Sequence, residues 1–281
     1  MKIKVCAIVS MFNPDVREID YLLSKIIDDV DLVYLVDNSD VKSELELESH
    51  EKVIIIQQEN SGITGAINSA VRKSEYEFDY YLLLDQDSSI DSNNLKLLLL
   101  GAEKKNLDIT APKILDETNV SIHENVINKG VKCDNYYVVT QTQLSGMLVS
   151  RKALIEVGLF NESYFLNLGD TEWCLRAKNK GYSIYINSES IMNHEYGDGF
   201  NNVLGYSYFY GAPFRLYYRS RDSMKLIFSN VSSYRVKAKL LLKLVVTPLE
   251  IIFLKNRKER ISFFYSGFIA FFSGEHGRMK D

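Results

Sequence analysis

Apolar residues in the first 105 positions of the chain recur with two different spacings. Between short runs of strand length, they fall three or four residues apart, as on one face of a helix. The strands are expected at 2–10, 32–37, 53–57 and 80–85, and the helices at 16–30, 62–73 and 94–105. Repeated strand–helix–strand units give parallel strands with helices on both faces of the sheet. The pattern therefore predicts an α/β protein with a mostly parallel central sheet.

The pattern changes twice beyond residue 105. From 109 to 149 the apolar runs are shorter and less regular, which predicts an antiparallel element added at the edge of the sheet. A short helix that Gly181 can end and an alternating strand over 182–186 follow. From residue 215 the chain consists of apolar and basic helical segments. We therefore predict a main domain over 1–214 and a helical extension over 215–281.

Composition is typical of a folded, intracellular protein. The 281 residues are 46% hydrophobic with four prolines, which is enough to form a sizeable core. The three cysteines are scattered and lack metal-ligand spacing, so neither a disulfide framework nor a zinc site is predicted. The apolar run at 5–11 is too short for the core of a signal peptide and is interpreted as the first strand. A reducing cytoplasm is therefore the expected location.

Charge is distributed unevenly. Residues 215–281 hold 14 Lys and Arg against 5 Asp and Glu, a net +9, which leaves −13 for residues 1–214 because the whole chain carries −4. Basic residues interleaved with Phe, Tyr and Leu predict a surface that meets anionic lipid or an anionic substrate carried on lipid, and an ordinary solvated helical bundle is the alternative. Nucleic acid is not expected, since no recognised binding motif accompanies the charge.

The most apolar stretch of the extension lies at 240–254. It is interrupted by Lys243, Pro248 and Glu250, whereas a transmembrane helix needs about 20 predominantly apolar residues. We therefore predict a core or interfacial helix there.

Two aspartates end the strand-length run in YYLLLDQDS, residues 80–88. An open α/β sheet binds its ligand at the carboxyl ends of its strands, where Asp85 and Asp87 would supply oxygen ligands. One interpretation is a divalent cation held against a diphosphate, and the other is a helix cap or a turn.

Two more segments carry residues suited to a nucleotide. Asp37 directly follows an apolar strand, where its carboxylate could accept the imino N–H of a pyrimidine, although a turn is the alternative. The segment ENSGITGAIN at 59–68 places small residues where a helix N-terminus would approach a ligand closely. It lacks the G-x-G-x-x-G pattern, which weakens a dehydrogenase interpretation.

Candidates for proton transfer and metal binding lie further along. Asp170 opens a helical segment, either as a cap or as a base, and the helix N-terminus is expected to keep it ionised while lowering its basicity. Glu172 and Arg176 are spaced i,i+4 on that helix. His194, near a strand end, is either structural or completes a metal site with the two aspartates.

Taken in order, these segments resemble the nucleotide-sugar glycosyltransferases of family 2, which have the GT-A fold, and among them the bacterial rhamnosyltransferase-like group. The matching segments are FNPD at 12–15, VDNSD at 36–40, ENSGITGAIN at 59–68, LLDQDS at 83–88, LSGMLVSRKALIEVGLFNESYF at 144–165, GDTEWCLR at 169–176 and NHEYGD at 193–198. Two positions depart from the family pattern: Gly169 stands where an acidic or β-branched residue is usual, and Phe12 replaces a tyrosine.

The resemblance implies an inverting sugar transfer with Asp170 as general base and a divalent cation, Mn²⁺ or Mg²⁺, at Asp87 and His194. The implied contacts to the nucleotide sugar come from Asn13, Asp37, Asn60, Gly65 and Asp85. The residues implied near the donor or acceptor sugar are Ser145, Gly146, Glu172 and Trp173. For Trp173, burial against the sheet is the alternative to a sugar platform.

The C-terminal segments YYRSRDSMKLI at 217–227 and SGFIAFFSGEHGRM at 266–279 also resemble the rhamnosyltransferase-like group, which favours dTDP-L-rhamnose as donor. UDP-galactofuranose, UDP-glucose and UDP-galactose stay open, because donor choice depends on pocket shape. The implied acceptor is a lipid-linked glycan of bacterial surface polysaccharide synthesis. Residues 1–214 would be the GT-A catalytic domain, and 215–281 would hold the enzyme peripherally at the inner face of the plasma membrane.

Two other function classes fit these residues less well. A non-catalytic nucleotide-sugar binding module would have no use for a positioned base, so the joint presence of Asp85, Asp87, Asp170 and His194 argues against it. A nucleotidyltransferase would need a glycine-rich triphosphate loop near the N-terminus, and residues 10–17 contain no glycine.

Overall fold

The computed structural model of the chain describes residues 3–42, 50–115, 127, 129–194, 200–203, 206–209 and 211–280, with side chains outside the description at 194, 200–203 and 206–209. The helices are α1 (Val16–Ile26), α2 (Gly62–Lys73), α3 (Ser92–Lys105), α5 (Arg151–Val157), α6 (Gly169–Asn179), α7 (Arg215–Phe228), α8 (Tyr234–Ile252) and α9 (Arg257–Phe272). The strands are β1 (Val5–Met11), β2 (Leu32–Asp37), β3 (Val53–Gln57), β4 (Tyr80–Asp85), β5 (Ser88–Ser89), β6 (Ile109–Leu115), β7 (Val131–Cys133), β8 (Tyr136–Val139), β9 (Leu148–Ser150), β10 (Ile184–His194), β11 (Phe200–Val203) and β12 (Tyr206–Phe209).

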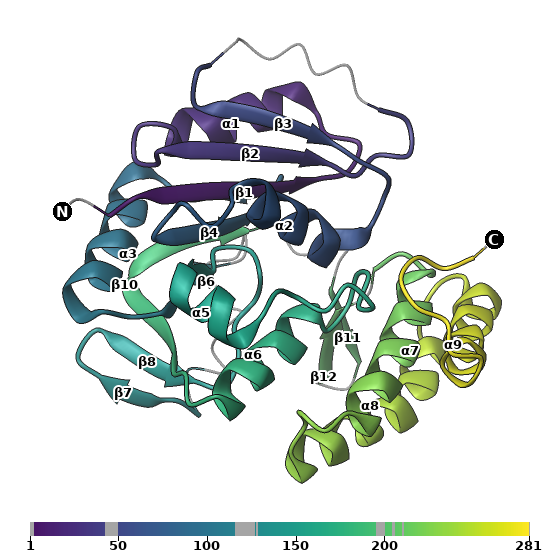
Figure 1. Cartoon of the computed structure of the whole chain (residues 1–281). Helices are drawn as coiled ribbons and strands as arrows, with labels where there is room; N and C mark the ends of the chain where they lie inside the picture. Colours follow the sequence, from purple (N-terminus) through teal and green to yellow (C-terminus); the bar gives the residue numbers. More distant parts are fainter. Residues whose placement is uncertain are drawn as a thin grey trace.

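The central sheet is parallel in its first half and mixed beyond (Figure 1). Its strand order is β3-β2-β1-β4-β9-β6-β10-β8-β7, with β5 paired to β10, and β11 and β12 form a separate hairpin. Strands β3, β2, β1 and β4 run parallel, whereas β9 is antiparallel to both β4 and β6. The predicted α/β architecture is confirmed. Strands β7 and β8 form an antiparallel pair at the end of the sheet, as predicted for 109–149, whereas the antiparallel β9 lies inside the sheet between β4 and β6.

Side chains alternate between two cores on opposite faces of this sheet, as the twofold period of a strand requires. From β1, Cys6 and Ile8 join the core under α2, α5 and α6, which includes Ala66 and Trp173. The intervening Val5, Ala7 and Val9 join the core under α1 and α3. The sheet is therefore buried on both faces, which explains why its strands are nearly continuous apolar runs.

The C-terminal helices α7, α8 and α9 lie together at one end of the molecule (Figure 1). They share a small core of their own around Leu216, Leu244 and Phe264. Two further clusters join them to the segment that precedes α6: Tyr217 and Tyr218 pack with Phe165, and Leu226 packs with Tyr164. Among the described residues, no helix is both long and apolar enough to cross a membrane.

Candidate active site

The parallel strands place two of the predicted acids at one edge of the sheet. Asp37 is level with Met11 across the β1–β2 pair, and Asp85 is level with Ser10 across the β1–β4 pair. With neighbouring strands about 4.8 Å apart, the two backbones lie roughly 10 Å from each other. The chain leaves β1 toward β2 on one side and reaches β4 on the other, so this edge is a topological switch point, where open α/β sheets bind ligands.

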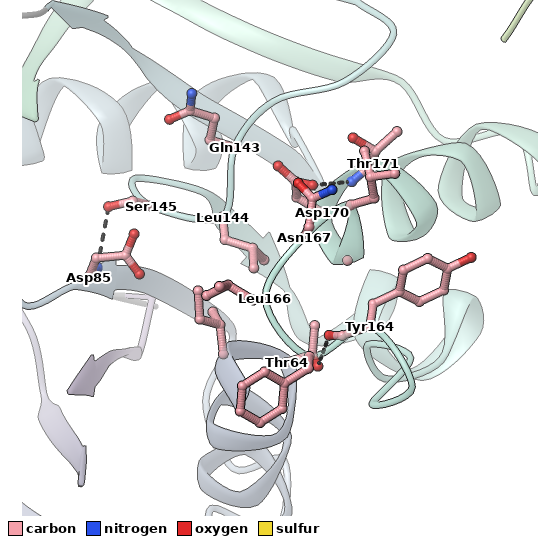
Figure 2. Close-up of a pocket in the computed structure, with 14 residues that line it drawn as sticks. Thr64, Asp85, Gln143, Leu144, Ser145, Tyr164, Leu166, Asn167, Asp170 and Thr171 are labelled. Carbon is pink, nitrogen blue, oxygen red and sulfur yellow. Dashed lines mark hydrogen bonds between the residues drawn. The ribbon is translucent and has the colours of Figure 1, made fainter. Parts of the chain in front are cut away.

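A pocket of about 270 Å³ opens beside the end of β4. Figure 2 shows Asp85 on one side of it and Asp170, at the start of α6, on the other. The remaining lining comes from Ile63 and Thr64 of α2, from segments 143–145 and 164–169, and from Thr171. Small-molecule sites usually enclose about 300–1,000 Å³, so the pocket is large enough for part of a small-molecule ligand rather than for a large ligand as a whole. Three predicted site residues, Asp85, Ser145 and Asp170, therefore line one pocket.

Two serine hydroxyls fix the backbone of Asp85. Its N–H points at both Ser88 Oγ (3.2 Å) and Ser145 Oγ (3.3 Å), and the two hydroxyls form a hydrogen bond with each other. The next residue, Gly146, forms a second link to β4, because its N–H donates to Leu83 O at 2.8 Å. Its φ is +84°, and a Cβ would meet Pro112 and Met192 at 3.0 Å, so glycine is required there. Ser145 and Gly146 thus hold the carboxyl end of β4.

The residues at the end of β4 suit a divalent cation that a diphosphate helps to hold. Asp87 is exposed in the turn between β4 and β5, two positions beyond the pocket-lining Asp85. The register of β5 on β10 sets the Cα of His194 opposite that of Ser88, although the side chain of His194 lies outside the described residues. Within the described residues no group of three or more acidic, His or Cys side chains could hold a metal alone. Two carboxylates completed by phosphate oxygens are nonetheless a usual arrangement for Mg²⁺.

Asp170 is a half-buried carboxylate in the first turn of α6. The N-cap residue of that helix is Leu168, which makes no side-chain cap, so Asp170 is not the cap that the sequence left as an alternative. Burial raises the pKa of Asp170, and hydrogen bonds from Thr171, including a 2.6 Å bond from its N–H to Oδ1, only partly oppose this. The expectation of a lowered basicity is therefore corrected: removal from water outweighs the helix terminus.

Gly169 departs from the family pattern because α2 leaves no room for a side chain. A Cβ at this position would lie 2.5 Å from Cγ2 of Thr64. Thr64 cannot easily move, since it is buried and its hydroxyl donates to Tyr164 O at 2.9 Å. The close packing of Gly169 against Thr64 therefore fixes the position of the neighbouring Asp170 at the pocket.

Gly169→Ala is accordingly expected to destabilise the protein by about 1–3 kcal/mol through overpacking, and to lower kcat by displacing Asp170. Thr64→Ser in the same chain removes the obstructing methyl group but keeps the hydroxyl, so it should restore most of the activity. Thermal unfolding and turnover of the single and double variants would test this. Equal defects with and without Thr64→Ser would contradict the steric explanation.

The predicted nucleotide-binding residues lie around the turns that follow β1, β2 and β3. Asp37 is 2% exposed and its Oδ1 accepts the Ser39 N–H at 2.9 Å. Asn13 has φ +48°, and its N–H donates to Ser39 Oγ at 2.7 Å. Asn60 accepts the Gly62 N–H at 3.2 Å. These bonds order the turns at the switch point, beside the pocket and outside its lining.

Glycines at the start of α2 are explained by the chain itself. Gly65 leaves no room for a Cβ because Ser61 lies against it, and Gly62, with φ +77°, faces the carbonyl of Phe165. Packing within the protein thus requires both glycines, and the approach of this helix start to a ligand stays a prediction.

Glu172 and Trp173 lie outside the pocket lining. Trp173 is 0% exposed, stacks on Phe160 with ring centroids 5.0 Å apart, and donates to Gly158 O at 2.8 Å. Glu172 pairs with Arg176 at 2.7 Å, as their spacing predicted. Neither side chain presents a surface to a sugar, so the expected acceptor contacts are corrected: both brace α6 against its neighbours, and the alternative of burial holds for Trp173.

Sequence reasoning missed the contribution of the C-terminal segment. Arg278 forms a two-pronged ion pair with Asp40, in the turn after β2, with Nη2 to Oδ2 at 2.8 Å. The Met279 N–H donates to Tyr218 Oη at 3.0 Å, and Tyr218 stacks on the pocket-lining Phe165. In this segment the sequence shows only the resemblance of 266–279 to the rhamnosyltransferase-like C-terminus. That resemblance does not indicate which residues the segment contacts.

The parallel strands, Asp37 and Asp85 at their switch point, and the half-buried Asp170 across the pocket from Asp85 are typical of one class, the GT-A nucleotide-sugar transferases. Two solved structures share the fold. TarS from S. aureus, solved in complex with UDP, aligns with TM-score 0.59 and 14% identity over 99% of this chain and 94% of that one. GalNAc-T7, solved with UDP, GalNAc and Mn²⁺, aligns with TM-score 0.58 and 12% identity over 86% of this chain, which spans 54% of it.

The sequence comparisons narrow the class to a family. The profile described as Glycosyl transferase family 2 matches residues 6–142. The dTDP-rhamnosyl transferase RfbF of Shigella flexneri is 28% identical over 242 residues, 82% of either chain. The low-salt glycan biosynthesis hexosyltransferase Agl10 of Haloferax volcanii is 26% identical over 166 residues, 53% of this chain and 54% of that protein. The chain is a sugar-transferring enzyme that resembles glycosyltransferase family 2 and, within it, the rhamnosyltransferase-like group.

Proposed function

We propose that the protein transfers L-rhamnose from dTDP-L-rhamnose to a hydroxyl of a lipid-linked glycan in bacterial surface polysaccharide synthesis. The observation that carries this proposal is the placement of Asp85 and Asp170 on opposite sides of one pocket at the switch point of the sheet. A donor diphosphate at the end of β4 would leave its sugar between the two carboxylates. The similarity to RfbF supports dTDP-L-rhamnose as the donor.

The mechanism assigns the proton transfer to Asp170. Its raised pKa makes it a stronger base than an ordinary aspartate, and the bond from the Thr171 N–H holds the carboxylate in place. It takes the proton of the acceptor hydroxyl as that oxygen attacks the anomeric carbon from the face opposite the diphosphate, which inverts the centre. Asp87, with Asp85 and His194, would hold Mn²⁺ or Mg²⁺, and the ion would neutralise charge on the departing diphosphate.

The donor side would be formed by Asn13, Asp37, Asn60 and Gly65 with the turns that they order. In this proposal Asp37 meets the pyrimidine and Ser145 with Gly146 holds Asp85 beside the sugar. UDP-galactofuranose, UDP-glucose and UDP-galactose are the competing donors, and TarS and GalNAc-T7 were both solved with UDP. We also propose that residues 1–214 form the catalytic domain and that 215–281 form an extension that places it at the inner face of the plasma membrane.

Calorimetric titration of the protein with dTDP and UDP, with and without Mn²⁺, tests the donor, and product analysis with the preferred sugar nucleotide tests the reaction. We expect metal-dependent binding selective for dTDP and release of dTDP from dTDP-L-rhamnose. Selectivity for UDP would replace the donor. Absence of binding would favour a non-catalytic module, and release of pyrophosphate from a nucleoside triphosphate and a sugar phosphate would indicate nucleotidyl transfer.

A further inference from the structure

Helix α8 buries one face and exposes an apolar one. Its buried stripe includes Leu244, Thr247 and Ile251, which face α7 and α9. The exposed apolar side chains, with their exposed fractions, are Leu241 (49%), Leu242 (64%), Val245 (70%), Leu249 (59%), Ile252 (50%) and, just after the helix, Phe253 (58%). At about 100° per residue these six positions fall within roughly 120° of the helix surface. They form one continuous stripe, which we call the α8 apolar stripe.

Positive charge borders the α8 apolar stripe. On the same helical projection, Lys237 lies at one margin of the stripe, and Arg235 and Lys239 lie at the other, within roughly 40° of its edges. Further basic residues follow directly after the helix, at Lys255, Arg257 and Lys258. The one carboxylate of α8, Glu250, is 9% exposed and lies 3.8 Å from Arg219, so it does not offset this charge at the surface.

We infer that the α8 apolar stripe is a membrane-docking surface that lies in the headgroup region of an anionic bilayer, with the helix axis parallel to the membrane plane. An apolar face with lysines and arginines at its margins fits such a surface, because the apolar side chains enter the acyl boundary while the cations meet lipid phosphates. A partner protein would be expected to complement the apolar stripe without needing cations along both margins. The inference rests on the proposed membrane placement of residues 215–281, for which it names the surface, but it does not depend on which sugar is transferred.

Flotation of the full-length protein with vesicles tests this inference. The wild type is expected to float with phosphatidylcholine vesicles containing phosphatidylglycerol, and to bind pure phosphatidylcholine vesicles much more weakly. Val245→Glu combined with Leu249→Glu should weaken partitioning by more than about tenfold, because two inserted side chains become charged. The matched control is Ile155→Glu on α5, an equally drastic change at a position that is 60% exposed and outside the stripe. It should float like the wild type.

A second pair of variants tests the charge. Lys237→Glu with Lys239→Glu is expected to reduce binding to anionic vesicles about tenfold or more, since each cation near such a surface contributes about fivefold. Lys104→Glu on α3 is the control and should have no effect. Wild-type binding should also fall in about 1 M salt, where charges are screened beyond about 3 Å. Unchanged dTDP binding by each variant shows that the fold and the donor site are intact.

Three results would overturn the inference. The first is a wild type that binds dTDP but does not float with anionic vesicles. The second is equal flotation with neutral and anionic vesicles. The third is a lipid-free wild type that sediments as a dimer which Val245→Glu dissociates, because the α8 apolar stripe would then be covered by a second copy of the chain. Failure of sugar transfer alone would leave the vesicle results unaffected.

Discussion

Replacing Asp170 by asparagine is expected to lower the rate of sugar transfer by about 10²- to 10⁴-fold, the range usual for a general base. The amide keeps the shape of the carboxylate but cannot take the proton of the acceptor hydroxyl. Donor affinity should stay within about twofold of the wild type, because an interaction made only in the transition state affects kcat rather than binding. Steady-state turnover and calorimetric titration with the donor nucleotide measure the two effects separately.

The pH dependence of the wild type gives an independent check on Asp170. Transfer requires the ionised carboxylate, so kcat/KM should fall as the pH drops through its pKa. Because burial raises that pKa, the acidic limb should lie at higher pH than for an exposed aspartate.

The matched control for Asp170→Asn is Asp91→Asn, which changes another helix-start carboxylate, the N-cap of α3, outside the pocket. It should leave kcat unchanged, and retention of most transfer by Asp170→Asn would remove Asp170 from the mechanism.

Asp87→Asn is expected to abolish most of the metal-dependent part of donor binding. Loss of groups that merely orient a metal ligand costs about 10- to 100-fold in metal affinity, so loss of a ligand charge should cost at least about tenfold. Titration of dTDP in the presence of Mn²⁺ and in its absence gives the metal-dependent part directly. The variant should match the wild type without metal and fall below it with metal.

Asp20→Asn is the control for Asp87→Asn, since it removes an exposed carboxylate from α1 without approaching the site. Its binding curves should coincide with those of the wild type under both conditions. If Asp87→Asn also left the effect of Mn²⁺ on dTDP binding unchanged, the ion would have to be held elsewhere.

In the parallel half of the fold, the sequence predicted three strands and one helix to the residue, because the local signals agree there, and it placed β1, α1 and α3 to within two to four residues at their ends. Strands β2, β3 and β4 and helix α2 begin and end where their apolar patterns begin and end. The strands on the far side of β4 were predicted only as a shorter, less regular region. Their pairing depends on contacts distant in the chain, such as β9 lying antiparallel between β4 and β6, which periodicity does not encode.

The sequence predicted those site residues that belong to a recognisable motif. It did not predict the positions whose role depends on packing against distant parts of the chain. The resemblance brought Asp85, Ser145 and Asp170 together, and they do line one pocket. It could not show that Trp173 faces the core, because an aromatic side chain at the start of a helix suits a core and a ligand equally well. Likewise, the need for glycine at position 169 comes from Thr64, which is distant in sequence.

The ion pair between Arg278 and Asp40 bears on folding during synthesis and on the design of truncated variants. Its partners are 238 positions apart, so the turn after β2 leaves the ribosome long before the arginine that holds it exists. Asn60, predicted at the donor nucleotide, bonds to the same Asp40. A chain cut at residue 214 would thus retain every strand of the central sheet but lose a restraint beside the proposed nucleotide site. Point substitutions on α8, rather than truncations, are the means to separate the proposed membrane attachment from donor recognition.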